Sequence, residues 1–251
     1  MKRLVTHTQV VLLQGSANPL SVHTLVATAV RLAHAIGLSL PLTHFGLSEV
    51  QINERRDVFW ILYIIEKTFS IQTGRPAIIH DQDIGISLPK PYTPISLPQS
   101  EKPDFSTFLV WAKLARIESR VYSELYSARS RTRSVLQRLT SVGNLDLELQ
   151  KWLDSVPLKI RPEHDILCGD QHLLPVIVLH YSYYHCLTAI HRASVQSGPW
   201  TSDPSDPNTV PQNVNLNPRV YTSGAICVTA ARRIIHCLDL FKRDRPPPLI
   251  W

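Results

Sequence analysis

The chain has 251 residues, of which 44% are hydrophobic, and a formal net charge of +6 from 26 Lys and Arg against 20 Asp and Glu. A chain of this size and composition is typical of a soluble globular protein and buries a sizeable core without disulfides or metals. The positive charge suits nucleic-acid or acidic partners but also many proteins with neither, so charge alone identifies no partner.

Membrane-spanning and secretory segments are excluded by the short apolar runs. The longest run, residues 58–65, is far below the roughly 18 residues that a membrane span needs. The basic first residues are followed by an apolar run of only residues 10–13, too short for a signal peptide. The cysteines form no C-x-x-C pair and lie in or beside apolar runs, so we expect free thiols in a reducing, intracellular compartment. They are Cys168, Cys186, Cys227 and Cys237.

The first two predicted helices follow each other in the first third of the chain. Apolar side chains recur at helical spacing, and Gly37 follows them as a left-handed C-terminal residue. This predicted core stripe comprises Leu25, Val26, Ala29, Val30, Ala33 and Ile36. The second helix is predicted over residues 48–72, because Ser48 and Gln51 have the spacing of a capping box.

Four more helices are predicted between the proline-rich stretches. One starts at Phe105 after a capping Asp104; the others cover residues 146–153, 172–194 and 220–241. The core side of the helix from Phe105 is predicted to comprise Leu109, Ala112, Ile117, Val121 and Leu125.

The prolines mark the predicted loops. Most of the 19 prolines fall in residues 76–103, 199–218 and 246–248. No segment alternates like a strand. We therefore predict an all-α fold, an irregular bundle of seven to nine helices with long Pro-rich loops. Residues 1–251 form one helical domain in this prediction, with a flexible loop at 200–217.

Three stretches together resemble one known family along nearly the whole chain. The first, residues 29–38, reads AVRLAHAIGL and includes Arg31 and Gly37. The second, residues 54–63, reads ERRDVFWILY and includes Arg56 and Trp60; it is followed by Gly74-Arg75-Pro76, Asp83-Ile84 and Leu88-Pro89. The third runs from Trp152-Leu153 and Pro157 to Leu179-His180-Tyr181, Leu187 and His191-Arg192. The ordered set is similar to the fungal-specific transcription factor domain, the middle homology region of zinc-cluster transcription factors.

The resemblance implies the regulatory region of a nuclear protein that controls DNA-templated transcription. DNA and zinc binding belong, in that family, to an N-terminal six-cysteine cluster that is absent from this sequence. We therefore expect this chain alone to bind neither zinc nor specific DNA. Its expected partners are DNA through the missing domain, a small-molecule effector, and co-regulators or a second copy. One departure is Glu66-Lys67, where the family has Asp-Arg, so that the forked guanidinium is lost.

The family motifs are interpreted as structural. Arg56 and Trp60 are one turn apart and share a helix face. We expect Trp60 in the core, with the Arg56 stem on its ring and a carboxylate as its partner, in preference to a binding surface. Gly74 and Pro76 are expected to end the helix, and Arg75 to form a buried ion pair with Asp81 or Asp83.

The histidines of the later helix do not predict a metal site. His180 and His191 share a face with Tyr184 and Leu187, with His185 off it. The two are about three turns apart, too far to bind one ion, so a packed aromatic and histidine stripe is the favoured interpretation. A cavity beside this helix would favour the alternative of a small-molecule-sensing module without DNA contact.

A helix predicted over residues 113–138 is the most basic stretch. We interpret it as a solvated helix face and turn, with non-specific DNA contact left open. Its cations are Lys113, Arg116, Arg120, Arg129, Arg131, Arg133 and Arg138, against Glu118 and Glu124. No G-x-S-x-G occurs, the carboxylates are scattered, and Cys–His catalysis has no local support. We predict no catalytic residue and no enzymatic activity.

Overall fold

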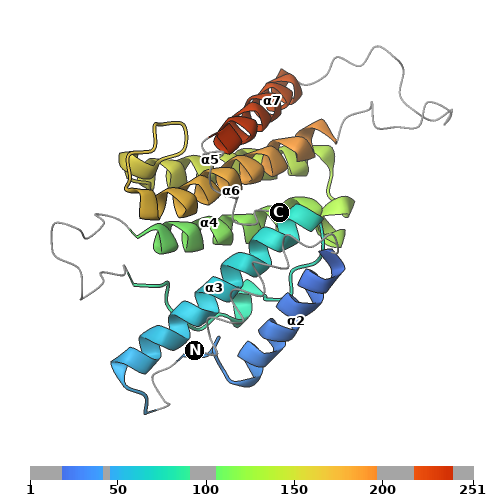
Figure 1. Cartoon of the computed structure of the whole chain (residues 1–251). Helices are drawn as coiled ribbons and strands as arrows, with labels where there is room; N and C mark the ends of the chain where they lie inside the picture. Colours follow the sequence, from blue (N-terminus) through green and yellow to red (C-terminus); the bar gives the residue numbers. More distant parts are fainter. Residues whose placement is uncertain (1–18, 42–45, 91–105, 197–217, 240–251) are drawn as a thin grey trace. The chain divides into compact units, whose positions relative to one another are not determined.

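The described part of the chain consists of helices and loops. The structure, a computed structural model, describes residues 19–41, 46–90, 106–196 and 218–239. These residues form six α-helices joined by loops and short 3-10 and π turns, and they contain no strand (Figure 1). The all-α prediction is confirmed. The segment 200–217 and most of the Pro-rich stretches lie outside the described residues.

The chain separates into two compact units, and the boundary falls inside helix α4 (Thr107–Val121), between Ala115 and Arg116. Each unit has its own buried residues. The assignment of residues 1–251 to a single domain stays a prediction.

The first unit is built on helices α2 (Pro19–Ala35) and α3 (Glu49–Thr73), which pack against each other (Figure 1). Helix α3 begins at the predicted capping box: Ser48 Oγ accepts from the Gln51 N–H, and Gln51 Oε1 accepts from the Ser48 N–H. These bonds satisfy two backbone donors that have no partner within the helix. The core cluster comprises Val22, Val26, Val30, Ala33, Leu38, Phe59, Trp60, Tyr63, Ile64, Ile79, Ala112 and Ala115.

The stripe predicted for α2 combines two faces of the helix. Val26 and Val30 are buried, and Val22, one turn earlier, joins them. Leu25 and Ile36 are 41% and 59% exposed, so their assignment to the core is wrong. Since residues four apart share a face, the valines at 22, 26 and 30 form the tighter stripe and are the ones buried.

The second unit has helix α6 (Asp170–Val195) at its centre, packed against α5 (Val135–Ser155) and α7 (Pro218–Asp239) (Figure 1). A π-helical turn η4 (Tyr122–Tyr126) follows α4. Two 3-10 turns, η5 (Ala128–Thr132) and η6 (Leu158–Ile160), precede and follow α5.

The basic stretch 113–138 is not one helix, contrary to the prediction. Ser127 and Ser134 both adopt extended backbone, and they cap the 3-10 turn η5 and helix α5, respectively. Ser134 forms a capping box with Gln137, which starts α5 eleven residues before the predicted Asp146. Serine side chains compete with helical backbone bonds and favour caps, and here two of them divide the stretch.

Helix α6 is apolar enough to be compared with a membrane span. Residues Leu173–Val195 have a mean hydropathy of 1.3, and 56% of the tested window is buried inside the protein. Both α5 and α7 pack on this helix, and its residues His180 and His191 are buried. Helix α6 is therefore a core helix of the second unit.

Candidate functional site

Two side chains of α3 bind backbone carbonyl groups on either side of that helix in the chain. The Arg55 guanidinium donates from Nη2 to the carbonyl of Ile36, just after α2, over 2.6 Å. Trp60 is 2% exposed, as its predicted core position requires, and its indole N–H donates to the carbonyl of Ser87 over 2.7 Å. Both carbonyls belong to segments without a regular backbone partner. The family motif of α3 thus holds neighbouring segments in place.

Arg56 has a different partner from the one predicted. The residue is 6% exposed, and its Nη2 donates to Asn53 Oδ1, one helical turn earlier. Among the described residues Arg56 forms no ion pair with a carboxylate. Burial raises the pKa of the nearby Asp57, and the Arg56 charge opposes that shift. An amide one turn away binds the guanidinium without bringing a second full charge into the core, and the buried Arg56 Nε has no hydrogen-bond partner within the described part of the chain.

Glu66 and Lys67 form a buried pair that binds the loop after α3. Their side chains are 3% and 1% exposed, and Lys67 Nζ lies 3.1 Å from Glu66 Oε2. Glu66 Oε1 accepts from the Ile78 N–H over 2.7 Å, and Lys67 donates to the carbonyl of Ile79. The ammonium also lies 5.1 Å from the centre of the Tyr63 ring. This is where the sequence departs from the family's Asp-Arg. The compact ammonium has a carboxylate, a carbonyl and an aromatic ring as neighbours there, while Glu66 Oε2 has no hydrogen-bond partner among the residues that the structure describes.

The Gly-Arg-Pro turn ends α3 as predicted, but Arg75 has no ion pair. Gly74 is the left-handed C-cap with φ 67°, and the Ser70 hydroxyl donates to the carbonyl of Arg75 over 2.6 Å. Among the described residues Arg75 pairs with no carboxylate. Asp81, one of its expected partners, instead accepts from the Tyr63 hydroxyl over 2.7 Å.

His180 binds the backbone of the η6 turn. The residue is 4% exposed, and its Nε2 lies 2.9 Å from the carbonyl oxygen of Ile160. Burial lowers the pKa of His180, and the bond to the carbonyl opposes that shift. His180 therefore fixes the segment after α5 against α6.

His191 joins all three long helices of the second unit. Its Nε2 lies 3.2 Å from Asp146 Oδ1 on α5, and its Nδ1 lies 3.1 Å from Ser223 Oγ on α7. Ser194 Oγ lies 3.0 Å from Ser223 Oγ. A carboxylate only accepts, so a neutral His191 carries its proton on Nε2 and accepts from Ser223 through Nδ1. Asp146 and Ser223 are far from His191 in sequence, so no local sequence pattern predicts these contacts.

This Ser–His–Asp arrangement lacks the surroundings of a nucleophilic site. Ser223 is 4% exposed and lies within the second turn of α7, where the helix uses the neighbouring backbone N–H groups. An acyl-transfer site needs an accessible hydroxyl and N–H donors aimed at an oxyanion. The three side chains are suited to fixing α5, α6 and α7 together.

Of the remaining motif residues, Arg31, Pro76 and Arg192 are exposed, whereas Gly37 is buried. Arg31 is exposed on α2, and Gly37 has the predicted positive φ of 69°. Arg192 is exposed, with its guanidinium carbon 5.7 Å from the centre of the Tyr126 ring. Pro76 follows the αL residue Gly74 at the start of the loop after α3.

An aromatic cluster beside η6 includes Tyr184 of the predicted stripe, together with Trp152, Tyr183 and Glu163, which were not predicted. The Trp152 and Tyr183 rings stack with centres 5.8 Å apart, and the Tyr183 hydroxyl donates to Glu163 Oε1 over 3.3 Å. The Glu163 N–H donates to the Tyr184 hydroxyl, and Glu163 has an unusual positive φ of 76°. Burial raises the pKa of Tyr184 to about 12, so the phenol stays neutral. The adjacent Tyr183 and Tyr184 on an apolar helix are the sequence feature that could have predicted this cluster.

The cations of the basic stretch are partly used in structural contacts. Arg120 forms ion pairs with Glu124, at 2.9 Å, and with Glu148. Arg133 donates to the carbonyl of Glu124 and to the Ser141 hydroxyl, over 3.2 and 3.0 Å. Arg129 and Arg131 are exposed on η5. The basic stretch is therefore interrupted by turns, and some of its cations are used in contacts within the chain. It is not a continuous recognition helix.

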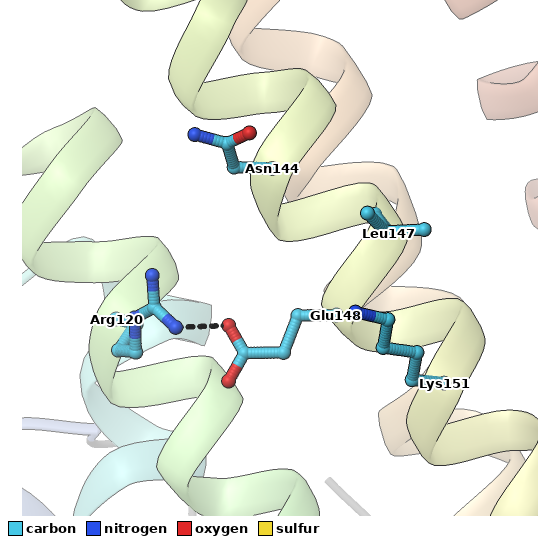
Figure 2. A pocket seen from close by; sticks show the side chains of 5 residues that line it. All are labelled: Arg120, Asn144, Leu147, Glu148 and Lys151. Atoms are coloured by element: carbon cyan, nitrogen blue, oxygen red, sulfur yellow. Dashed lines mark hydrogen bonds and ion pairs between the residues drawn. The ribbon is translucent and has the colours of Figure 1, made fainter.

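A pocket of about 340 Å³ lies on α4 and α5, open to solvent (Figure 2). Figure 2 shows the Arg120–Glu148 ion pair across it, with Leu147 as its one apolar side chain. The lining residues are Arg120, Asn144, Leu147, Glu148 and Lys151. Small-molecule sites enclose most of the ligand surface, and this pocket is open to solvent, so it does not resemble one. Neither His180 nor His191 lines it.

The described residues hold no group of three His, Cys, Asp or Glu side chains placed to share a metal ion. Cys186, Cys227 and Cys237 are free thiols, and burial raises the pKa of Cys186 well above its ordinary value. A thiol in that setting stays protonated and behaves as a small apolar side chain.

Comparison with known proteins identifies the family. Residues 9–154, more than half of the chain, match the fungal specific transcription factor domain. The chain is 44% identical over 234 residues to an ABC-transporter-regulating transcription factor of Aspergillus oryzae, and equally to one of Aspergillus fumigatus. Each alignment covers 90% of this chain and 26% of the relative.

More distant relatives have the same kind of role. The chain is 27% identical over 233 residues to a transcriptional activator of Neurospora crassa, covering 83% of this chain and 24% of that protein. It spans about a quarter of the length of the curated relatives it matches. No solved structure matches it. These relatives are transcription regulators, and the chain belongs to the fungal-specific transcription factor domain family.

Proposed function

We propose that this chain is the regulatory region of a nuclear transcription factor that controls the expression of ABC-transporter genes. The observation that carries the proposal is the 44% identity, over 90% of the chain, to two relatives named for that role. The chain covers 26% of those relatives, so base-specific DNA contacts and zinc binding are assigned to another part of the factor.

The proposed role is regulatory and not catalytic. The polar clusters of the described residues tie helices and loops together: the Glu66–Lys67 pair in the first unit, and His191 with Asp146 and Ser223 in the second. Such buried polar contacts favour one arrangement of helices and loops. A region of this kind acts on transcription through its contacts with other polypeptides.

The direct test is deletion of the gene in its host fungus, with measurement of ABC-transporter transcripts. The transcripts are expected to change in the deletion strain and to be restored by the intact gene. A gene carrying Lys67→Met, which breaks the buried pair, is expected to fail, whereas Lys90→Met, which removes an exposed pair with Glu49, restores expression. Transporter transcripts that stay at the wild-type level after deletion contradict the proposal.

The purified chain tests whether DNA and zinc binding belong to another part of the factor. Its binding to duplex DNA is expected to be weak and to vanish across a rising salt series, because only non-specific phosphate contacts are available. The same sample is expected to contain no stoichiometric zinc by elemental analysis. Sequence-selective binding that survives physiological salt, or one tightly held zinc per chain, would overturn this assignment.

A further inference from the structure

Helix α7 has an apolar row on the face turned away from α6. Tyr221, Val228 and Ile235 are 65%, 51% and 63% exposed. They repeat every seven residues, and Ala225, also exposed, lies between the first two. At 100° per residue this row is opposite the buried side of the helix. The buried residues of α7 are Ser223, Ala230 and Cys237.

The spacing of this row is that of a helix–helix seam. Side chains at intervals of four and three residues meet a second helix along one line, as a and d positions do in coiled coils. A single exposed apolar side chain needs no explanation, but three large ones in register on one helix mark a contact surface.

The charge of the same surface is entirely positive. Arg232 lies within the row, between Val228 and Ile235, and is exposed. It forms no ion pair with a carboxylate among the described residues. Arg233 lies outside the row, and its charge acts on Tyr184 of α6 and on Cys237. From Pro218 to Cys237 the sequence contains no Asp or Glu. A partner on this face must therefore supply the acidic side chains.

We propose that the outer face of α7 is the docking site for an acidic amphipathic helix of a partner protein. The partner's apolar side chains would cover Tyr221, Val228 and Ile235, and its carboxylates would pair with Arg232. Opposite charges across a seam fix its register and exclude other partners.

Two other occupants fit this surface less well. A second copy would bring one α7 against another, and every charge at that contact would be a cation. The chain's own longer segments outside the described residues are also unsuited. Residues 1–18 contain no acidic residue, and 240–251 contain one with three prolines, whereas 91–105 and 197–217 each contain two acidic residues and four prolines. Prolines at that density prevent a continuous helix.

The test uses the full chain and a fluorescent acidic probe peptide. The probe is a helix of 22 residues, the length of α7, with Leu at a and d positions and Glu at the flanking e and g positions. Fluorescence anisotropy is expected to show saturable binding, weakened about tenfold or more by Val228→Glu or by Arg232→Glu. Arg232→Lys keeps the charge and is expected to retain binding. Val135→Glu changes an equally exposed apolar residue on α5 and is the matched control.

Every variant changes an exposed side chain, so circular dichroism is expected to show unchanged folding. Equal binding by the Val228→Glu variant, or no saturable binding of the probe by the wild-type chain, would overturn the proposal. Sedimentation that finds a wild-type dimer, dissolved by Val228→Glu, would identify a second copy as the occupant and overturn it too. No DNA or transcript is involved, so failure here leaves the proposed regulatory role standing.

Discussion

At the scale of single residues, the charged groups buried on α3 act on the loop that follows it. Glu66 and Lys67 are neighbours in sequence, and each also binds the backbone of the segment 78–79. Such a pair adds little when compared with apolar residues of equal size, but removing one member leaves an uncompensated buried charge. The pair therefore makes the loop conformation sensitive to single substitutions.

Substitution Lys67→Met is expected to lower the free energy of unfolding by about 3 kcal/mol, because Glu66 then remains buried without its cation. Urea denaturation followed by circular dichroism measures the change. The control is Lys90→Met, which removes an ion pair in which both side chains are more than half exposed, and no measurable change is expected from it. Equal stability of the two variants would contradict the structural role of the buried pair.

Two histidines of α6 make the second unit sensitive to acid. Burial lowers the pKa of His180, and burial together with the Arg192 charge lowers that of His185 to about 4. The unfolded chain then binds more protons than the folded one below its own histidine pKa of about 6.5. The contribution of these neutral histidines to the free energy of unfolding is therefore fully present above about pH 6.5. It is lost as the pH falls toward the lower pKa values that the histidines have in the folded chain.

Between about pH 7.5 and about pH 5, the wild-type chain is expected to lose about 1–2 kcal/mol through His185 alone. The His185→Gln variant, which cannot take up that proton, is expected to lose correspondingly less. Urea midpoints of both proteins at the two pH values measure the difference. The same pH slope in both proteins would contradict the assignment to His185.

At the scale of elements, substitution of two glycines is expected to change the stability of the protein in opposite directions. Gly74 ends α3 with φ 67°, a conformation that other residues adopt only with strain. Gly143 lies exposed inside α5, where no atom stands within 4 Å of an added Cβ. Space is available at both positions, so backbone conformation alone decides the sign of a substitution.

Gly74→Ala is expected to destabilise the protein by about 1 kcal/mol, and Gly143→Ala to stabilise it by about 0.5–1 kcal/mol. Thermal unfolding of both variants under one condition tests the pair. Changes of the same sign would show that helix conformation is not what distinguishes the two sites.

The element boundaries show which features a sequence can predict. The start of α3 was predictable because Ser48 and Gln51 are three residues apart, and the same signal at Ser134 and Gln137 marks the true start of α5. On α2, by contrast, apolar residues cover two faces, so periodicity could not decide which face is buried. Long-range partners, such as Ser223 for His191, depend on how helices pack, and no local pattern predicts them.

At the scale of the whole molecule, the two compact units have separate sets of buried side chains. The core cluster of the first unit is formed by α2, α3, the loop after α3 and the start of α4. The second unit is organised by α6, with α5 and α7 packed on it. Units with their own cores open with different free energies.

Amide hydrogen exchange is expected to show this separation. Lys67→Met should increase exchange in α2 and α3, which belong to its own unit, more than in α6 and α7. Mass spectrometry of exchanged peptides from both proteins measures it. An equal increase in all four helices would mean that the chain unfolds as a single cooperative unit.

The apolar character of α6 has a consequence during synthesis. The ribosome completes α6 before it translates α7, and until then one flank of a helix that is hydrophobic enough to resemble a membrane span has no partner. Exposed apolar surface on a nascent chain attracts chaperones and promotes aggregation. A message cut short between the codons for Val195 and Pro218 should therefore yield a product that is degraded or precipitates, and not a partly working regulator.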